Sequence, residues 1–218
     1  MKRLIIIGEG PTEQEFCKDV MMPYFSAREI YIQNPTIKKT AGGITSWPAL
    51  KNQIENHLKQ EPDVYVTTLI DYYGIYGNHN FPGWSEGINI FDKFERLNRM
   101  EELMQLDISP AINSRFIPYV QLHEFEGLLF NDITVFEKNF KEDEFSNFNE
   151  LKVTIESFSN PELINDDIKS APSQRLERLI PGYKKIVYGA CLAQEIGLTR
   201  MRTKSTRFNE WISKLESI

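Results

Sequence analysis

Three short apolar runs stand out from the mixed pattern of hydrophobic and polar positions. They cover residues 4–7, 63–70 and 115–122 and are rich in apolar and β-branched residues, which is typical of β-strands. The first run contains no polar residue, as expected for a strand buried on both faces of a parallel sheet. The third contains Pro118, which has no N–H for a ladder hydrogen bond and therefore indicates an edge strand or an interruption.

Segments with helical spacing lie between and after these runs. Thr12 and Glu15 have the spacing of a capping box, so we expect a helix from Thr12 to about Met22, ended by Pro23. A helix over 90–106 is expected to have an apolar face of Phe91, Phe94, Leu97, Met100, Leu103 and Met104. Further helices are expected to open at Ser46-Trp47-Pro48 and Ala171-Pro172, and to cover most of 135–158, 184–196 and a last amphipathic segment with Phe208, Trp211, Ile212 and Leu215.

Strands that alternate with helices predict an α/β fold with a mostly parallel sheet flanked by helices. The strand patterns end before residue 134, and only helical patterns follow. We therefore expect residues 1–134 to form the α/β core and residues 135–218 to form a helical C-terminal region packed on it, together one compact domain.

The composition is that of a globular protein with a sizeable core. Of 218 residues, 41% are hydrophobic, and 14 Phe, 9 Tyr and 3 Trp argue against a disordered or disulfide-stapled chain. The two cysteines, Cys17 and Cys191, are too few for a disulfide framework or a zinc quartet. No apolar run approaches the roughly 18 residues that cross a bilayer, and the start of the chain lacks a signal-peptide core. We therefore expect a cytoplasmic protein with no membrane partner.

Charge is unevenly distributed along the chain. The net charge of −6 argues against a protein that holds nucleic acid by bulk charge alone. Residues 169–214 carry ten basic and three acidic side chains, a balance of +7, while the remainder, with 15 basic and 28 acidic residues, carries −13. This segment either balances acidic neighbours on a solvated face or forms a basic wall that guides a polyanion to an acidic site.

Acidic residues follow each of the three predicted strands. Glu9 follows the first strand, Asp71 the second, and Glu124 and Glu126 the third. Ligands gather at the carboxyl ends of the strands in a parallel sheet, so we expect these side chains to converge. Converging carboxylates repel one another unless a divalent cation lies between them, and oxygen ligands of this kind suit Mg²⁺ or Mn²⁺. Such ions activate water and steady the leaving oxygen of a phosphodiester.

Each acid also has a structural explanation. Glu9, Glu13 and Glu15 lie near the start of the first predicted helix, where negative charge interacts favourably with the helix dipole, and Glu15 has the spacing of a capping residue. Asp71 follows a strand, where aspartate often caps the next turn. The two glutamates after the third strand flank Phe125. The coincidence of acids at all three strand ends is what favours a shared site.

Basic residues in the C-terminal segment are candidates for phosphate contacts. Lys184 and Lys185 follow Pro181-Gly182-Tyr183, and one of them can neutralise a transition-state phosphate if their helix points at the acids. Arg200, Arg202 and Lys204 have a spacing that suits backbone phosphates. For each of these side chains, a solvated surface position is the simple alternative.

Several familiar catalytic motifs are missing from the sequence. The glycine-rich turn at 8–12 lacks the third glycine of a dinucleotide fingerprint and the Lys-Ser/Thr of a phosphate loop. No Gly-x-Ser-x-Gly or His-Glu-x-x-His pattern is present. His123, beside the acids of the third strand, is either a ligand or base, or a structural histidine.

These motifs together resemble a family of prokaryotic Toprim-like proteins over nearly the whole chain. Glu9-Gly10-Pro11-Thr12-Glu13 resembles the opening of Toprim domains, and Asp71 resembles the start of their second acidic motif. The other matching segments are Glu124 to Phe130, Pro181 to Lys185, Ile196 to Leu198, Arg200, Arg202 and Phe208 to Trp211. Where Toprim enzymes often have Asp-x-Asp, this chain has Asp71-Tyr72-Tyr73, so the second acid is absent.

The resemblance implies a Rossmann-like Toprim core and a metal-dependent nuclease, similar to that of overcoming-lysogenization-defect proteins. It implies Glu9 and Lys185 as catalytic residues, and Mg²⁺ or Mn²⁺ held by Glu9, Glu13, Asp71, Glu124 and Glu126. Lys184, Arg200, Arg202 and Lys204 would then contact DNA or RNA.

It further implies an ABC-type or AAA-type ATPase as a partner in anti-phage defence, with homo-oligomerisation left open. The alternatives are a non-catalytic adaptor or sensor for an ATPase, and a nucleotide phosphohydrolase.

Overall fold

A computed structural model describes residues 2–38, 43–165 and 170–218 of the chain. Its centre is a parallel sheet in the order β2-β1-β3-β4, in which β5 extends the pairing of β3. The strands are β1 (Lys2–Gly8), β2 (Ile30–Gln33), β3 (Val64–Asp71), β4 (Phe116–Ile117) and β5 (Val120–Gln121). The expected α/β class and parallel sheet are therefore confirmed.

The third expected strand is interrupted where its proline lies. β4 ends at Ile117, Pro118 and Tyr119 leave the ladder, and β5 resumes the pairing with β3 at Val120. Thr68 of β3 bridges the gap, because its hydroxyl accepts from the Tyr119 N–H at 3.0 Å and donates to the Tyr119 carbonyl at 2.9 Å. β2 has no counterpart among the sequence predictions, since this edge strand is only four residues long and alternates weakly between buried and exposed positions.

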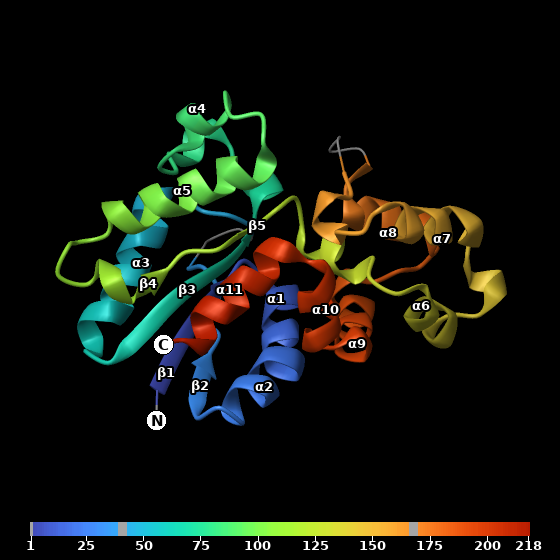
Figure 1. Ribbon diagram of the computed structural model, residues 1–218, viewed down its shortest axis with the longest axis horizontal. Helices are drawn as coiled ribbons and strands as arrows, with labels where there is room; N and C mark the ends of the chain where they lie inside the picture. Colours follow the sequence, from blue (N-terminus) through green and yellow to red (C-terminus); the bar gives the residue numbers. More distant parts are fainter. Residues whose placement is uncertain (1, 39–42, 166–169) are drawn as a thin grey trace.

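Helices cover both faces of the sheet (Figure 1). α3 and α5 pack on one face with Ile5 and Ile7 of β1. α1, α2 and α9–α11 pack on the other with Leu4 and Ile6. The helices are α1 (Pro11–Phe16), α2 (Met22–Ser26), α3 (Trp47–Gln60), α4 (Trp84–Gly87), α5 (Lys93–Asp107), α6 (Ile133–Asn139), α7 (Phe148–Ser157), α8 (Pro172–Leu179), α9 (Lys185–Ile196), α10 (Leu198–Lys204) and α11 (Thr206–Glu216).

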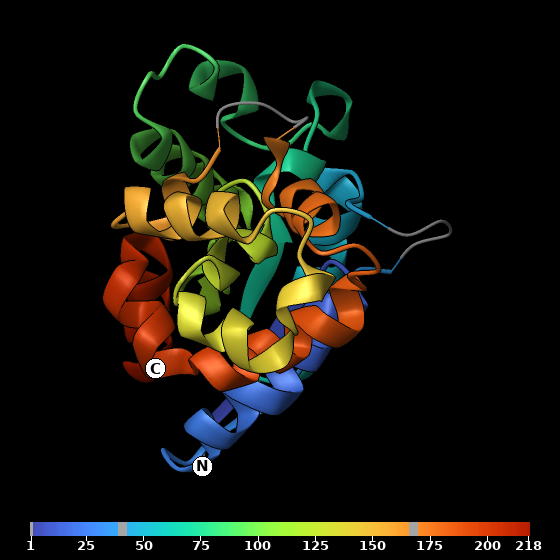
Figure 2. The same ribbon diagram turned by 90° about the vertical axis from the view of Figure 1, so that its right-hand side faces the viewer.

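The C-terminal helices share a core with the strands. One cluster of buried side chains contains residues of β1 and α1 as well as Leu192 of α9 and Phe208, Trp211 and Leu215 of α11. The expected helical C-terminal region is thus present and packs on the sheet. In both views the two termini lie at the end of the molecule where β1 begins, opposite the end toward which β1 and β3 run (Figure 1, Figure 2).

The first helix corrects the expected capping box. The helix begins at Pro11 with Gly10 as its N-cap, and Glu13, not Glu15, reaches back to the Gly10 N–H. Pro23 does not end the helix, because a π-helical turn (Cys17–Met21) separates α1 from α2 and Pro23 falls in the first turn of α2. Across the π turn the Met22 N–H still donates to the Cys17 carbonyl, so the helical run continues through Pro23 without a break.

Two further helical expectations need correction. The helix expected at 90–106 begins at Lys93, because the Asp92 carboxylate accepts from the N–H groups of Phe94 and Glu95 and so caps it. Phe91 therefore lies before the helix and is fully exposed. The segment expected to be helical over 135–158 is broken between α6 and α7, where Asn147 caps the second helix.

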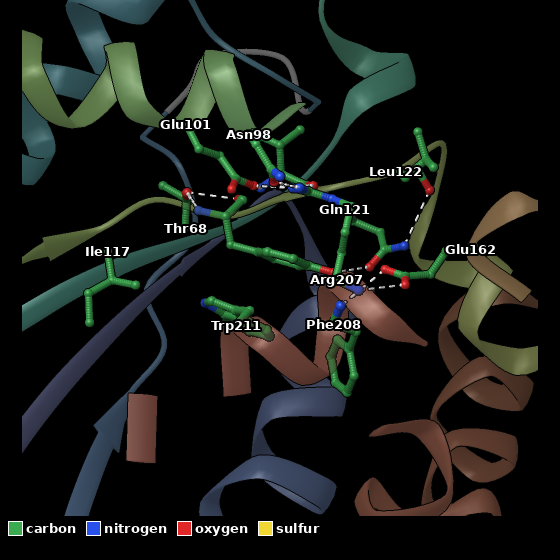
Figure 3. A network of polar contacts seen from close by, with 12 residues as sticks. Thr68, Asn98, Glu101, Ile117, Gln121, Leu122, Glu162, Arg207, Phe208 and Trp211 are labelled. Carbon is green, nitrogen blue, oxygen red and sulfur yellow. Dashed lines mark hydrogen bonds and ion pairs between the residues drawn. The ribbon is translucent and has the colours of Figure 1, made fainter. Parts of the chain in front are cut away.

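A buried polar network fastens α11 to the sheet and to α5 (Figure 3). The Arg207 guanidinium pairs with the Glu101 carboxylate at 2.5 Å. Glu162 accepts hydrogen bonds from the N–H groups of Arg207 and Phe208 at the start of α11. The Trp211 indole N–H donates to the Thr67 hydroxyl at 2.9 Å. These contacts orient α11 across the sheet.

Internal ion pairs neutralise much of the basic charge of the C-terminal segment. Of its basic residues, Lys169 lies outside the described residues, and six others pair with acids elsewhere in the fold. The pairs are Arg175 and Arg178 with Glu150, Lys185 with Glu126, Arg200 with Asp132, Arg202 with Glu216 and Arg207 with Glu101. This arrangement matches the first interpretation of the segment, in which it balances acidic neighbours.

Candidate active site

Two neighbouring strands bring the first two predicted acids together. β1 and β3 are paired along their length, with Gly8 opposite Leu69, so Glu9 and Asp71 emerge at the same carboxyl edge of the sheet. The Asp71 N–H donates to Oε2 of Glu9 at 3.2 Å. Gly74, in the turn after β3, comes so close that a Cβ at this position would lie 3.2 Å from Oε1 of Glu9.

Glu13 lies beneath this edge, in the first turn of α1. Its Oε2 accepts from the Gly10 N–H at 2.8 Å, which holds the carboxylate at the helix N-terminus. A Cβ at Gly8 would lie 3.0 Å from Cβ of Glu13, so the end of β1 has room for this side chain only because residue 8 is glycine. Glu13 is buried in this position.

The loop after β5 meets the end of β3. Oδ1 of Asp71 accepts from the Phe125 N–H at 2.9 Å, and the Tyr73 N–H donates to the His123 carbonyl at 3.1 Å. His123 is buried and has a φ of 65°, a left-handed conformation that non-glycine residues adopt infrequently. The backbone of this loop thus fixes Asp71 and turns the following residues toward the same edge.

Glu126 completes the group and pairs with a lysine. It lies in a 3₁₀ turn (Phe125–Leu129), is fully buried, and its Oε2 is 3.0 Å from Nζ of Lys185, the first residue of α9. Among the described residues, Oε1 of Glu126 has no hydrogen-bond partner. We call Glu9, Glu13, Asp71 and Glu126 the acid cluster.

Burial and mutual repulsion raise the pKa values of three members of the acid cluster, Glu13, Asp71 and Glu126. Burial, with the charges of Glu126 and Glu9, raises the pKa of Glu13 to about 7 against the opposing charge of Lys185. Burial and the charge of Glu13 raise the pKa of Asp71 well above its usual range, and burial also raises that of Glu126. For Lys185, burial lowers the pKa, but the surrounding carboxylates outweigh it and the net pKa is raised. The Lys185 ammonium thus faces several carboxyls, and the ionisation of each carboxyl disfavours the ionisation of the others.

Glu124, also predicted as a metal ligand, has a different local role. Its Oε2 accepts from the N–H and the hydroxyl of Ser173, at 3.0 and 2.7 Å, in the first turn of α8. Its charge still reaches Glu126, whose pKa it raises. Of the five acids predicted as metal ligands, four form the acid cluster, in which Glu126 pairs with Lys185, and Glu124 lies beside it.

The acids are not arranged as a ready metal site. In the part of the chain that the structure describes, no three His, Cys, Asp or Glu side chains are grouped so as to hold a metal ion. Glu13 and Asp71 are held by backbone N–H groups and Glu126 by Lys185. An ion would have to draw these side chains away from their present partners.

The four residues predicted to contact nucleic acid lie in different environments. Lys184 is exposed immediately before α9. Arg200 pairs with Asp132 at 2.5 Å, Arg202 pairs with Glu216, and Lys204 donates to the Asn131 carbonyl. Three of the four predicted side chains therefore already have internal partners.

Sequence reasoning assigned no role to two residues that shape this site. Gly8 makes room for Glu13, and the only sequence signal for it is a glycine at the end of a buried strand. Tyr183 belongs to a motif noted in the sequence, yet its buried hydroxyl faces α9 rather than solvent. Its position depends on the packing of α9 against α1, which residue spacing does not reveal.

Fold and site together define an α/β protein with a parallel sheet and a buried group of carboxylates and one lysine at its carboxyl edge. Residues 8–216 match the family described as a domain of unknown function, DUF4276, and the chain belongs to this family. Neither a curated protein nor a solved structure matches it significantly. No helix in the described ranges is long and apolar enough to cross a membrane.

Proposed function

We propose that this protein is a metal-dependent phosphodiester hydrolase of Toprim type that cuts nucleic acid. The observation that carries the proposal is the acid cluster itself, in which four carboxyls from three separate segments gather at the carboxyl edge of the sheet and one of them pairs with Lys185. A purely structural core has little reason to gather so many carboxyls whose burial disfavours their charge.

The residues present suit Mg²⁺ or Mn²⁺ by their chemistry. The acid cluster offers carboxylate oxygens only, the donor type that both ions prefer. Glu9, Glu13, Asp71 and Glu126 would hold the ion, with Glu124 in support. When bound, the ion would supply an activated water and stabilise charge on the phosphate oxygens.

The other proposed roles fall to lysine, glutamate and arginine side chains of the chain itself. Lys185, half-buried and paired with Glu126, would supply positive charge to a phosphate oxygen of the substrate. Glu9 either binds the ion or acts as general base. Lys184 is exposed and accessible to the phosphate backbone of a nucleic acid. By contrast, contact with a phosphate would require Arg200, Arg202 and Lys204 to leave their present partners.

The biological setting follows the resemblance to stand-alone Toprim-like proteins. We propose that the protein acts as an effector in anti-phage defence with an ABC-type or AAA-type ATPase as its partner, in the cytoplasm. Such a partner would explain a site in which Lys185 holds Glu126 in the isolated chain.

Cleavage assays test the proposal directly. Supercoiled plasmid, single-stranded DNA and total RNA are incubated with purified protein in Mg²⁺, Mn²⁺ or EDTA. Glu9→Gln and Asp71→Asn should abolish metal-dependent cutting, since each removes a carboxyl ligand from the acid cluster. Glu15→Gln is the matched control, because Glu15 lies in the same helix as Glu13 but pairs with Lys18 at the surface. Cutting that persists in both cluster variants contradicts the proposal.

A second measurement separates the alternatives when no cutting occurs. Mn²⁺ is titrated calorimetrically against the wild type and Asp71→Asn. Binding lost in the variant keeps the hydrolase proposal and points to a requirement for the ATPase. Absence of binding in the wild type favours the non-catalytic adaptor, which needs no ion at these acids. Hydrolysis of mononucleotides but not polymers favours a nucleotide phosphohydrolase.

A further inference from the structure

We propose that Tyr183 is a positioning residue that, together with Glu126, holds one water molecule at the acid cluster. The inference rests on the proposed hydrolytic function, in which that water lies ready for attack on a phosphodiester. It adds a specific residue outside the acids and lysine described above.

The turn before α9 fixes the ring of Tyr183 firmly. Gly182 has a φ of 88°, and the Tyr183 N–H donates to the Ile180 carbonyl at 2.9 Å. The ring stacks on Tyr188, with 5.8 Å between ring centroids and 24° between ring planes. The tyrosine is therefore buried in one orientation, and its hydroxyl has little freedom to seek a partner elsewhere.

The hydroxyl points into the contact between α9 and α1. A Cβ at Gly189 would lie 3.4 Å from Oη of Tyr183, and 3.8 Å from a methyl carbon of Thr12, the residue before Glu13. The absence of a side chain at Gly189 thus leaves space beside the hydroxyl. Among the described residues, this hydroxyl is buried with no hydrogen-bond partner.

A buried acceptor faces the same region. Glu126 is fully buried, and its Oε1 also has no hydrogen-bond partner among the described residues. Both groups lie along one face of α9, because Glu126 pairs with Lys185 and the Tyr183 hydroxyl lies beside Gly189, one helical turn further on. Burial and the charge of Glu126 raise the pKa of the Tyr183 phenol. The phenol therefore stays protonated and acts as a donor. Buried donors and acceptors are seldom left unpaired in folded proteins.

The chemistry of the two groups selects the missing partner. An atom between them must accept a hydrogen bond from the phenol and donate one to the carboxylate. A phosphate oxygen or a metal ion has no hydrogen to donate, whereas water does both. A polar site lined by such partners is where ordered water is found in proteins. The water held there lies beside Lys185, the group proposed to meet the phosphate.

Tyr183→Phe removes the hydroxyl and leaves the ring. With cleavable substrate and Mn²⁺, we expect kcat to fall at least about tenfold, the effect of losing one well-placed hydrogen bond, with KM unchanged within about twofold. The melting temperature should change little, because the packing of the ring is preserved. Tyr188→Phe, on the stacked neighbour, is the matched control and should retain its kcat. A Tyr183→Phe variant with wild-type kcat overturns the inference, even if Glu9→Gln shows that the hydrolase proposal is correct.

A second readout requires no activity. Long-lived buried water gives nuclear Overhauser effects to nearby protons, here the Gly189 amide and the Thr12 methyl group. We expect this signal in the wild type and in Tyr188→Phe, and its loss in Tyr183→Phe. If the wild type shows no such water, the inference fails, whatever the cleavage assays give. If the wild type cuts nothing but the water is present and lost as expected, the water-holding role stands while the hydrolase proposal is the one in question.

Discussion

Glu13 provides the sharpest test of the electrostatics of the acid cluster, because the shift of its pKa is large. Its pKa rises from 4.5 to about 7, chiefly through burial. In the folded protein it therefore keeps its proton to near neutrality, while in the unfolded chain it loses the proton near 4.5. Between these pH values the native state binds more protons than the unfolded state, so stability falls as pH rises through this window.

The magnitude follows from the two pKa values. Each tenfold change in proton affinity is worth about 1.4 kcal/mol, so the difference corresponds to about 3 kcal/mol. This contribution is fully present below pH 4.5 and is lost above about pH 7. Glu13→Gln removes the charge but keeps an oxygen for the Gly10 N–H. The variant should come within about 1 kcal/mol of the wild type at pH 5 and exceed its free energy of unfolding by about 3 kcal/mol at pH 8.5.

Urea denaturation in EDTA at both pH values measures the difference without interference from metal. Glu15→Gln in the same helix is the control and should show no pH-dependent gain, since Glu15 is partly exposed beside Lys18. A Glu13→Gln variant that is no more stable than the wild type at pH 8.5 would refute the reasoning. The fold would then stabilise the Glu13 carboxylate instead of disfavouring its charge.

Further predictions concern the buried network and two glycines. Arg207→Met should destabilise the protein by about 3–5 kcal/mol because it leaves Glu101 buried and unpaired, and the double variant with Glu101→Leu should recover part of this loss. If urea denaturation gives the same loss of stability in the single and the double variant, the unpaired charge of Glu101 is not the cause of the loss. Gly83→Ala should cost about 1–3 kcal/mol, since residue 83 has a φ of 74° and a Cβ would lie 3.1 Å from Cα of Met100. Gly189→Ala should change stability by less than about 1 kcal/mol, because the helix propensity gained with alanine is offset where its Cβ, 3.4 Å from the Tyr183 hydroxyl, displaces the proposed water. Thermal melts that rank the two alanine variants the other way would contradict both expectations.

Much of the fold was predictable because local patterns carried it. The apolar runs near residues 4–7 and 63–70 became β1 and β3, and Pro118 interrupted the third strand as expected. α3 begins at Trp47, with a proline in its first turn. By contrast, Phe91 was assigned to an apolar helix face from its spacing alone, but the Asp92 cap starts α5 after it. Caps and edge strands depend on one or two hydrogen bonds, which periodicity does not register.

The candidate site, like the fold, was predictable only in part. Acids after buried parallel strands were expected to converge, and Glu9 and Asp71 do so, because neighbouring strands end at one edge. The spacing of residues did not distinguish Glu126, which joins the cluster, from Glu124, which serves α8. Two residues apart on an irregular turn, they differ only in which neighbour the packed chain places beside them.

Hydrophobic pattern and chain direction were enough to predict every strand except β2, most helices and the placement of acids at strand ends. The pairing of Lys185 with Glu126, the burial of Tyr183 beside Gly189 and the internal pairing of most of the basic C-terminal charge became visible only in the folded chain. Each of these depends on contacts between residues far apart in the chain, and the strength of a charge or a hydroxyl depends on the burial that such contacts create.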